Sequence, residues 1–303
     1  MTAIGLDLGG TKIETQVFDA NWTVLRKNRV ETPGDYDSLV QAMADQIAWA
    51  NAPDAPIGIA AAGLINPRTG LAYTANLPAT GKPFPADITR AANRPIEYVN
   101  DCRAMTLSEA IFGAAQGRNP VVGLILGTGI GAGVAVRGTL LEGLSRVGGE
   151  FGHTPAPAHL VVKHGLPIVK CGCGRMGCFE TYIAGPGLTR LAQHVMGQKL
   201  SPKSLAALRG TDPKADTIWA IWVEMVAELL ITLTLMIDPE CVVLGGGLSL
   251  IDGVVPDLQQ ALQTAQLPGF DVPEILLAEG GETSGARGAA YAAWLTQKAS
   301  AHV

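Results

Sequence analysis

Charged residues are scarce in this chain, and neither sign dominates. Aspartate, glutamate, lysine and arginine make up 16% of the 303 residues, and the formal net charge is −5. This mild acidity gives no support to binding of nucleic acid or of a membrane surface. Hydrophobic residues make up 48%, which indicates a compact globular protein and excludes a disordered one. The length allows two domains, each with its own core.

Targeting signals and long apolar runs are also missing. No basic segment followed by an apolar stretch opens the sequence, so no signal peptide is expected. The most apolar window, Val226–Ile237, is interrupted by Glu228 and is shorter than the roughly 20 residues that cross a bilayer. We expect a buried helix that stops at Asp238-Pro239. The sequence therefore predicts a soluble, cytoplasmic protein.

Cysteine is rare, and its distribution is informative. The chain has five, an odd number, and nothing suggests secretion, so a disulfide framework is disfavoured. Cys171, Cys173 and Cys178 lie within eight positions, with glycines between them. Together with His153 they supply the three sulfurs and one imidazole of a tetrahedral structural zinc site. Ordinary buried thiols are the alternative, and we favour a zinc staple with no open position.

Two glycine-rich turns each join consecutive strands. Ala3–Leu8 is expected to be a strand that turns at Gly9-Gly10-Thr11-Lys12 and resumes at Ile13–Phe18. Val121–Leu126 likewise turns at Gly127-Thr128-Gly129-Ile130-Gly131-Ala132-Gly133 and continues as a strand at Val134–Arg137. Because a strand and not a helix follows each turn, neither is a dinucleotide fingerprint or a P-loop. The backbone N–H groups of such turns can bind phosphate, although plain tight hairpins are the alternative.

The repeated hairpin predicts an internal duplication, with two related α/β domains and a cleft between them. The first domain would span 1–117 and be completed by a C-terminal helix at about 288–303, and the second would span 118–287. A third glycine cluster, Gly245-Gly246-Gly247, ends a later strand. Asp7, just before the first turn, could hold Mg²⁺ through water.

Asn100-Asp101 follows a strand expected at Ile96–Val99 and precedes a helix expected at Thr106–Ala115. The carboxyl end of a strand is a usual place for a general base in an open α/β sheet. Aspartate also favours the helix N-cap. Spacing alone therefore supports a general base and a helix cap about equally.

These motifs together resemble those of the ROK sugar kinases, within the actin-like and hexokinase-like ATPases. The resemblance runs from Gly5 to about Ala290. The cysteine block with its following glutamate is the most specific part. The matching motifs are Asp7-x-Gly9-Gly10-Thr11-Lys12, Asn100-Asp101, Gly127-Thr128-Gly129-x-Gly131, Glu150-x-Gly152-His153 and Cys171-x-Cys173-Gly174-x-x-Gly177-Cys178-x-Glu180.

The resemblance implies an actin-like, hexokinase-like ATPase fold of duplicated ribonuclease-H-like domains that close on sugar and ATP. Asp101 would be the catalytic base, and His153 would place one ring nitrogen on zinc and the other toward the sugar. The segments Gly9–Lys12 and Gly129–Val136 would surround the phosphates of ATP, with Mg²⁺, and Gly245-Gly246-Gly247 would border the adenosine. The residues that would bind sugar hydroxyls are Asn100, Glu150, His153 and Glu180.

One position departs from the family's pattern. The family commonly has asparagine two residues after the catalytic aspartate, where this chain has Arg103. Arg103 is either a surface residue or a contact for phosphate or substrate. Positions two apart on a helix point to different faces, so we favour a surface residue that need not touch what Asp101 touches.

The expected reaction is transfer of the γ-phosphate of ATP to the 6-hydroxyl of a hexose. We favour N-acetyl-D-glucosamine, because Tyr73–Pro78 and Glu150–His153 resemble N-acetylglucosamine kinases. Asn76 and the Gly63 turn are candidates for the acetamido corner. The segments Gly113–Ala115 and Gly280–Ala290 lean toward the fructokinase/mannokinases, which with glucokinases are the alternative substrate classes.

Two other classes of protein are alternatives to a kinase. A sugar-responsive repressor of the same family is disfavoured, because the first strand begins at Ala3 and leaves no room for a helix-turn-helix segment. A zinc-dependent hydrolase would need an open coordination position. A homodimer is the default expectation for a cytoplasmic enzyme.

Overall fold

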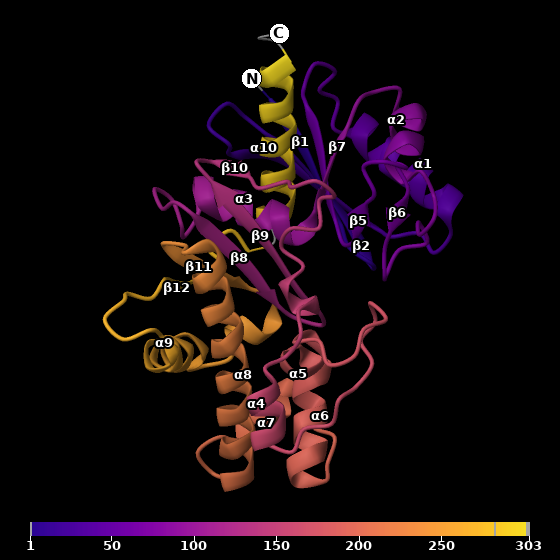
Figure 1. Cartoon of the computed structure of the whole chain (residues 1–303). Coiled ribbons are helices and arrows are strands. Elements are labelled where there is room, and N and C mark those ends of the chain that lie inside the picture. The colour runs from indigo at the N-terminus through magenta and orange to yellow at the C-terminus, as the bar shows by residue number, and fades with distance from the viewer. Residues whose placement is uncertain (1, 282, 301–303) are drawn as a thin grey trace. The chain divides into compact units, whose positions relative to one another are not determined.

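The computed structural model describes residues 2–281 and 283–300 (Figure 1). The chain forms two compact units. The first comprises Met1–Gly117, Gly133–Gly148 and Glu279–Val303, and the second comprises Arg118–Ala132 and Gly149–Ala278. The chain forms two five-stranded sheets with corresponding strand orders, β3-β2-β1-β4-β7, which lies in the first unit, and β10-β9-β8-β11-β12, of which β8, β11 and β12 lie in the second unit.

The first sheet begins with the predicted hairpin. β1 and β2 are antiparallel, with Leu8 opposite Ile13 across the glycine turn, so that prediction is confirmed. β4 and β7 continue the sheet parallel to β1. A separate small sheet pairs β5 with β6. The strands are β1 (Ala3–Leu8), β2 (Lys12–Phe18), β3 (Val24–Glu31), β4 (Ile57–Ala61), β5 (Leu64–Ile65), β6 (Ala72–Tyr73) and β7 (Glu97–Asn100).

Helices cover both faces of this sheet. Alternate residues of β1, namely Ile4, Leu6 and Leu8, lie in one apolar core with Leu39 of α1 and Phe84 of α2. The opposite face packs on α3 and α10. The helices are α1 (Tyr36–Trp49), α2 (Phe84–Ala92), α3 (Asp101–Phe112) and α10 (Thr283–Ser300).

The contact between α10 and the sheet requires glycine. A Cβ atom on Gly5 of β1 would lie 2.0 Å from the carbonyl oxygen of Ala286, and one on Gly58 of β4 would lie 1.9 Å from that of Ala289. A side chain at either position would push the helix away from the sheet. The helix therefore lies directly on the strand backbones, as its course along β1 shows (Figure 1).

The second sheet repeats the hairpin around the second glycine turn. β11 runs parallel to β8 and to β12, and the chain passes into the first unit within β9. The strands are β8 (Val121–Leu126), β9 (Ile130–Val136), β10 (Thr139–Leu140), β11 (Cys241–Gly245) and β12 (Glu274–Leu277). The helices are η1 (Phe151–His153), α4 (Ala158–Lys163), α5 (Glu180–Ile183), α6 (Gly185–Met196), α7 (Pro202–Leu208), α8 (Pro213–Ile237), η2 (Gly247–Leu250) and α9 (Val254–Ala265).

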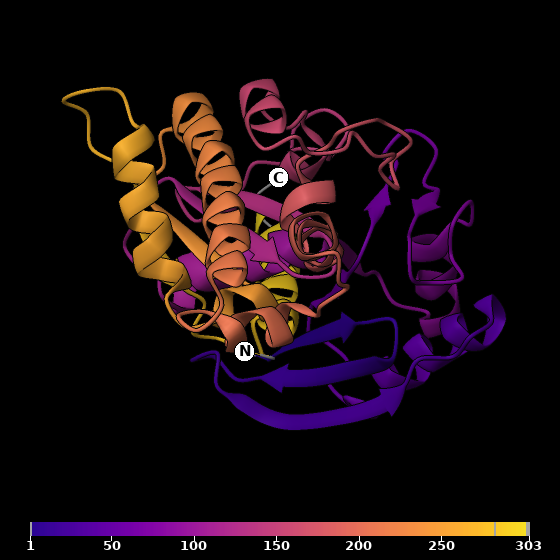
Figure 2. The same ribbon diagram turned by 90° about the horizontal axis from the view of Figure 1, so that it is seen from below.

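The apolar window around Val226 belongs to a longer helix than expected. α8 has 25 residues and begins at Pro213, so by length and composition alone it could cross a membrane. Its side chains such as Trp222 and Leu229 are instead buried, and it packs against α5, α6 and α9. Figure 2 shows α8 and α9 side by side. The predicted stop is confirmed, because Asp238 ends the helix in the left-handed conformation.

The structure differs from the expected division of the chain at two segments. Residues 133–148 and 279–287, expected in the second domain, group with the first unit. Gly133 lies against α3, where a Cβ atom would come within 2.6 Å of Thr106 Oγ1. The second segment leads into α10, which packs on the first sheet and on α3. Residues 301–303 of the expected C-terminal helix lie outside the described part of the chain.

Candidate active site

The predicted site residues divide between the two units. In the first unit they are Asp7, Gly9, Gly10, Thr11, Lys12, Asn76, Asn100 and Asp101. In the second unit they are Gly127, Thr128, Gly129, Gly131, Glu150, His153, Cys171, Cys173, Cys178, Glu180, Gly245 and Gly246.

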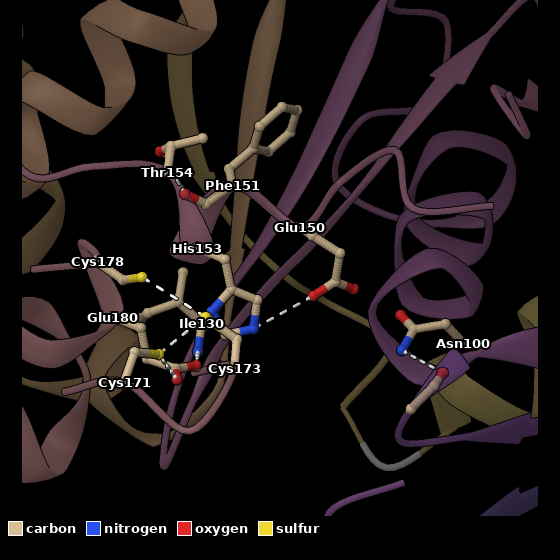
Figure 3. A network of polar contacts seen from close by, with 11 residues as sticks. Asn100, Ile130, Glu150, Phe151, His153, Thr154, Cys171, Cys173, Cys178 and Glu180 are labelled. Atoms are coloured by element: carbon tan, nitrogen blue, oxygen red, sulfur yellow. Dashed lines mark hydrogen bonds and ion pairs between the residues drawn. The ribbon is translucent and has the colours of Figure 1, made fainter. Parts of the chain in front are cut away.

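Asn100 is the N-cap of α3. Its Oδ1 accepts hydrogen bonds from the backbone N–H of Cys102 (3.0 Å) and of Arg103 (3.3 Å). Its Nδ2 donates to the carbonyl oxygen of Gly63 at 3.2 Å, a bond drawn in Figure 3. The helix consequently starts at Asp101, five residues earlier than the sequence predicted. The capping role, which the sequence left open for Asp101, belongs to its neighbour.

Asp101 is a partly buried carboxylate at the first position of this helix. Burial raises its pKa above the ordinary value, and the hydrogen bond from the backbone N–H of Cys102 (2.9 Å) opposes only part of that shift. Burial also raises the pKa of the Tyr98 hydroxyl, and the negative charge of Asp101 raises that pKa further. A carboxylate with a raised pKa binds a proton more readily, as a general base should.

The first glycine turn is closed by backbone hydrogen bonds. The N–H of Gly9 donates to the carbonyl oxygen of Lys12 (2.9 Å), and the hydroxyl of Thr32 donates to that of Gly9 (2.7 Å). The open side of Gly10 faces Asn76, 3.4 Å from where a Cβ atom would lie. The structure therefore brings Asn76 beside the turn.

Asp7 lies at the end of β1 against the start of α10. A Cβ atom on Gly285 would come within 2.7 Å of Asp7 Oδ2, so only glycine leaves room for this carboxylate. A carboxylate next to the first turn of a helix is favoured by the helix dipole. Carboxylate oxygens such as those of Asp7 are also the ligands that Mg²⁺ prefers.

The four predicted metal ligands converge in the second unit. The ligand atoms of His153, Cys171, Cys173 and Cys178 all lie within 4.8 Å of one another. The Sγ atoms of Cys173 and Cys178 are 3.7 Å apart, and His153 Nδ1 is 3.5 Å from Cys171 Sγ. All five cysteines lie in the described part of the chain, and each is a free thiol.

These separations match a tetrahedral zinc site. Zn–S bonds of about 2.3 Å and Zn–N bonds of about 2.0–2.1 Å place two sulfurs about 3.8 Å apart and a sulfur about 3.6 Å from a nitrogen. Burial raises the pKa of the Cys171 thiol to about 12 and also raises that of Cys178. These sulfurs would stay protonated at neutral pH unless a cation held them as thiolates. The set is thus compatible with zinc.

Two carboxylates lie next to the metal-ligand set (Figure 3). Glu180 Oε2 accepts a hydrogen bond from the backbone N–H of Ile130 (2.9 Å), while its Oε1 is 3.6 Å from Cys171 Sγ. Glu150 Oε2 is 3.7 Å from His153 Nε2, on the ring edge opposite the sulfurs. Glu180 therefore joins the cysteine cluster to the second glycine turn, and the histidine has one nitrogen on each side.

The second and third glycine clusters meet where β8 and β11 end. A Cβ atom on Gly246 (φ 84°) would lie 2.4 Å from the carbonyl oxygen of Leu126. Beside them is a cavity of about 1380 Å³, with Gly127, Thr128 and Gly247 in its wall.

Sequence reasoning missed the other wall of this cavity. Lys199 and Ser201, between α6 and α7, and Lys203, at the start of α7, line it. Ser201-Pro202 is a recognisable helix start, and Ser201 Oγ indeed accepts from the N–H of Ser204 (3.0 Å). Nothing local, however, indicates that this start faces the glycine clusters.

The chain matches the model of the ROK family over residues 3–297. It belongs to the ROK family. An N-acetylgalactosamine kinase, AgaK, from Shewanella sp. (strain ANA-3) is 39% identical over 292 residues, covering 94% of both chains. An N-acetyl-D-glucosamine kinase from Pectobacterium atrosepticum is 38% identical over 294 residues, covering 94% of this chain and 97% of the relative.

Solved ROK structures agree with this assignment. A ROK hexokinase from Thermus thermophilus superposes with a TM-score of 0.89 at 33% identity, covering 99% and 100% of the two chains. A ROK family glucokinase from Streptomyces griseus, in complex with glucose and AMPPNP, gives 0.75 at 27% identity, covering 96% and 98%. The predicted α/β class and the predicted family are confirmed.

Arg103, the departure from the ROK pattern, is not a surface residue as expected. Only 5% of it is exposed, and its guanidinium donates to the carbonyl oxygens of Leu141 (2.7 Å) and Arg146 (3.0 Å). The expectation was wrong because residues 133–148, placed in the other domain by the sequence, cover this side chain.

Replacing Arg103 by asparagine should destabilise this ROK protein. The shorter amide reaches neither carbonyl oxygen, and leaving buried acceptors unpaired costs about 1–3 kcal/mol. We expect the free energy of unfolding in urea to fall by that amount. Arg90→Asn, at an arginine whose side chain is 77% exposed, is the control and should change it little. Equal stability of the two variants would contradict this role for Arg103.

Proposed function

We propose that this ROK protein phosphorylates the 6-hydroxyl of N-acetyl-D-glucosamine with ATP. That it is an ATP-dependent sugar kinase is supported by the kinases among its relatives and the ROK hexokinase and glucokinase structures. The observation that carries the reaction is the Asp101 carboxylate, partly buried and with a raised pKa, directly after β7 and Asn100. The choice of an acetamido sugar is supported by relatives named for N-acetylglucosamine and N-acetylgalactosamine.

Asp101 is the proposed general base. It takes the proton of the 6-hydroxyl as that oxygen attacks the γ-phosphorus of ATP in line. The O–H bond and the bond from the γ-phosphorus to the bridging oxygen break, the new O–P bond forms, and ADP leaves. When bound, Mg²⁺ offsets the charge of the phosphates. Asp7 is the residue that would hold it through water.

The nucleotide would be held by the glycine clusters. Gly9, Gly10, Thr11 and Lys12 are proposed phosphate contacts, since their turn offers backbone N–H groups and one cation. In the second unit, the cavity beside Gly127 and Gly246 has room for a nucleotide. The proposed nucleotide contacts there are Gly127, Thr128, Gly129, Gly131, Gly245 and Gly246.

Sugar hydroxyls would be bound by Asn76, Asn100 and Asp101 in the first unit and by Glu150, His153 and Glu180 in the second. The proposed zinc takes His153 Nδ1 and the three thiolates, which leaves Nε2 for the sugar. Zinc does no chemistry in this account. It fixes the segments that carry Glu150, His153 and Glu180.

We further propose that the two units are related ribonuclease-H-like domains of the actin and hexokinase type that act together on sugar and ATP. Their corresponding strand orders support this. A cytoplasmic homodimer is the proposed working form. A role as a DNA-binding regulator is disfavoured by the acidic charge balance.

Cys178→Ser should abolish zinc binding, because a hydroxyl is a poor replacement for a thiolate ligand. We expect elemental analysis to find one zinc per chain in the parent protein and far less in the variant. Cys241→Ser, at a buried cysteine of β11 outside the cluster, is the matched control and should keep its zinc. Parent protein that contains no zinc, although produced with zinc available, would contradict the proposed site.

Asp101→Asn should lower kcat without lowering the stability of the protein. The amide cannot take the proton, so kcat should fall by about 10²–10⁴-fold. The raised pKa means that the folded state disfavours the charged carboxylate, so at neutral pH the variant should be at least as stable as the parent. That advantage should disappear at acidic pH, where Asp101 is protonated in both folded and unfolded chains. Activity within a few-fold of the parent would show that Asp101 is not the base.

An ADP-release assay across N-acetylglucosamine, N-acetylgalactosamine, glucose, fructose and mannose tests the proposed substrate. A site that pairs with the acetamido N–H and C=O leaves these groups unsatisfied with a plain hexose. We therefore expect kcat/KM for N-acetylglucosamine to be at least about tenfold above that for the plain hexoses. A tenfold preference for fructose, mannose or glucose would overturn the substrate, and no ADP release with any sugar would overturn the kinase.

A further inference from the structure

Glu109 is a buried carboxylate near the end of α3 that the proposed mechanism does not use. Its Oε2 accepts hydrogen bonds from the backbone N–H of Ala114 (3.1 Å) and of Glu279 (3.0 Å). Its Oε1 accepts from the N–H of Gly280 (2.9 Å) and from the hydroxyl of Ser284 (2.6 Å). Four donors from two distant segments therefore converge on one side chain within the first unit.

Glu109 can serve all four donors because it is ionised. Burial opposes its ionisation, but hydrogen bonds from Ser284, Glu279, Gly280 and Ala114 lower its pKa below the ordinary value. A carboxylate has only acceptor sites, two on each oxygen. Each oxygen here receives two donors, which is the arrangement that an ionised carboxyl satisfies fully.

Two glycines leave room for this carboxylate. A Cβ atom on Gly113 would lie 2.1 Å from Glu109 Oε2, and one on Gly280 would lie 2.8 Å from Oε1. Both belong to the segments Gly113–Ala115 and Gly280–Ala290, which the sequence comparison associated with fructokinase/mannokinases. The need to make room for Glu109 explains the glycines at these two positions without reference to the sugar.

The four donors lie where the chain passes between the units and where α10 begins. Ala114 precedes the passage into the second unit after Gly117, and Glu279 is the first residue after the return. Ser284 lies in the first turn of α10. The next residue, Gly285, is the glycine that packs against the carboxylate of Asp7.

We infer that Glu109 is a positioning residue for nucleotide binding by the first unit. It fixes Ala114 and the segment Glu279–Gly280 to α3. Through Ser284 it also holds the start of α10 beside Asp7. This inference rests on the proposed role of Asp7 in holding Mg²⁺ and ATP. Glu109 would therefore strengthen nucleotide binding without contacting the nucleotide, because its carboxylate is hydrogen-bonded to Ala114, Glu279, Gly280 and Ser284.

Glu109→Gln is the variant that tests this role with the least loss of packing. The amide oxygen should face Ala114 and Glu279, because both offer N–H groups that only an acceptor can satisfy. The NH₂ group then faces Gly280 and Ser284, where the hydroxyl can turn to accept but the Gly280 N–H cannot. The variant should thus leave the Gly280 N–H without an acceptor and loosen the chain just before α10, while Ala114 and Glu279 keep their bonds to the amide oxygen.

We expect hydrogen exchange at the Gly280 amide to become about 10- to 100-fold faster in Glu109→Gln, since it loses a charged acceptor. The Kd for MgATP, measured by calorimetry without sugar, should rise by about tenfold, which corresponds to roughly one misplaced polar contact. The Kd for N-acetylglucosamine, measured without nucleotide, should stay within about twofold. Asn100 bonds Gly63, and the loop that contains Asn76 is closed by a bond from the Thr74 hydroxyl to the Leu77 carbonyl oxygen, so neither depends on Glu109.

Ser108→Ala is the matched control. Ser108 is a buried neighbour on the same helix, it accepts a hydrogen bond from Arg287 Nε (2.9 Å), and it bonds none of the four donors. This variant should leave exchange at Gly280 and both dissociation constants unchanged. Unchanged Gly280 exchange in Glu109→Gln, or equal losses of sugar and MgATP affinity, would overturn the inference. Failure of the parent to phosphorylate any sugar would instead contradict the proposed function, which these binding measurements do not require.

Discussion

The hydrogen bonds that Asn100 accepts at the start of α3 are the constraint on which the first unit depends. By capping the helix, Asn100 fixes Asp101 at its first position and ties the helix start to Gly63. The same start sends Arg103 inward to the carbonyl oxygens of Leu141 and Arg146. Near the other end, Glu109 holds the segments that lead to and from the second unit. One helix thus carries the proposed base, the arginine that holds residues 141 and 146, and the carboxylate that holds the chain near two of its four crossings between the units.

In the second unit a single carboxylate has a comparable position. Glu180 contacts Cys171 through one oxygen and the backbone N–H of Ile130 through the other. Glu180 therefore links the metal-ligand set to the second glycine turn. A zinc ion bound there, as proposed, would fix Glu180 and through it the glycine turn, so it would affect both the proposed sugar contacts and the proposed nucleotide contacts.

Local patterns in the sequence predicted much of this arrangement. The two hairpins follow from apolar runs broken by glycine, and the His153 and cysteine set follows from ligand type and spacing. The start of α3 was predicted five residues late, and the cap is Asn100, whose side chain accepts from the N–H groups of Cys102 and Arg103, whereas the sequence suggested only Asp101 as a cap.

Long-range packing could not be predicted in the same way. Arg103 was expected at the surface because nothing near it in sequence shows that residues 133–148 cover it. Glu109 gave no signal at all, since its four donors lie up to 175 positions away. The glycines at positions 113 and 280 belong to segments that resemble the fructokinase/mannokinases, but both leave room for the Glu109 carboxylate, which is distant in sequence from Gly280.

The pH dependence of kcat/KM for N-acetylglucosamine, at saturating ATP, tests the central claim most directly. If Asp101 is the base and burial raises its pKa, kcat/KM should fall on acidification with an apparent pKa above the ordinary aspartate value of about 3.9. A profile that stays flat down to about pH 4 would contradict the account, because a base with the raised pKa would already be protonated there.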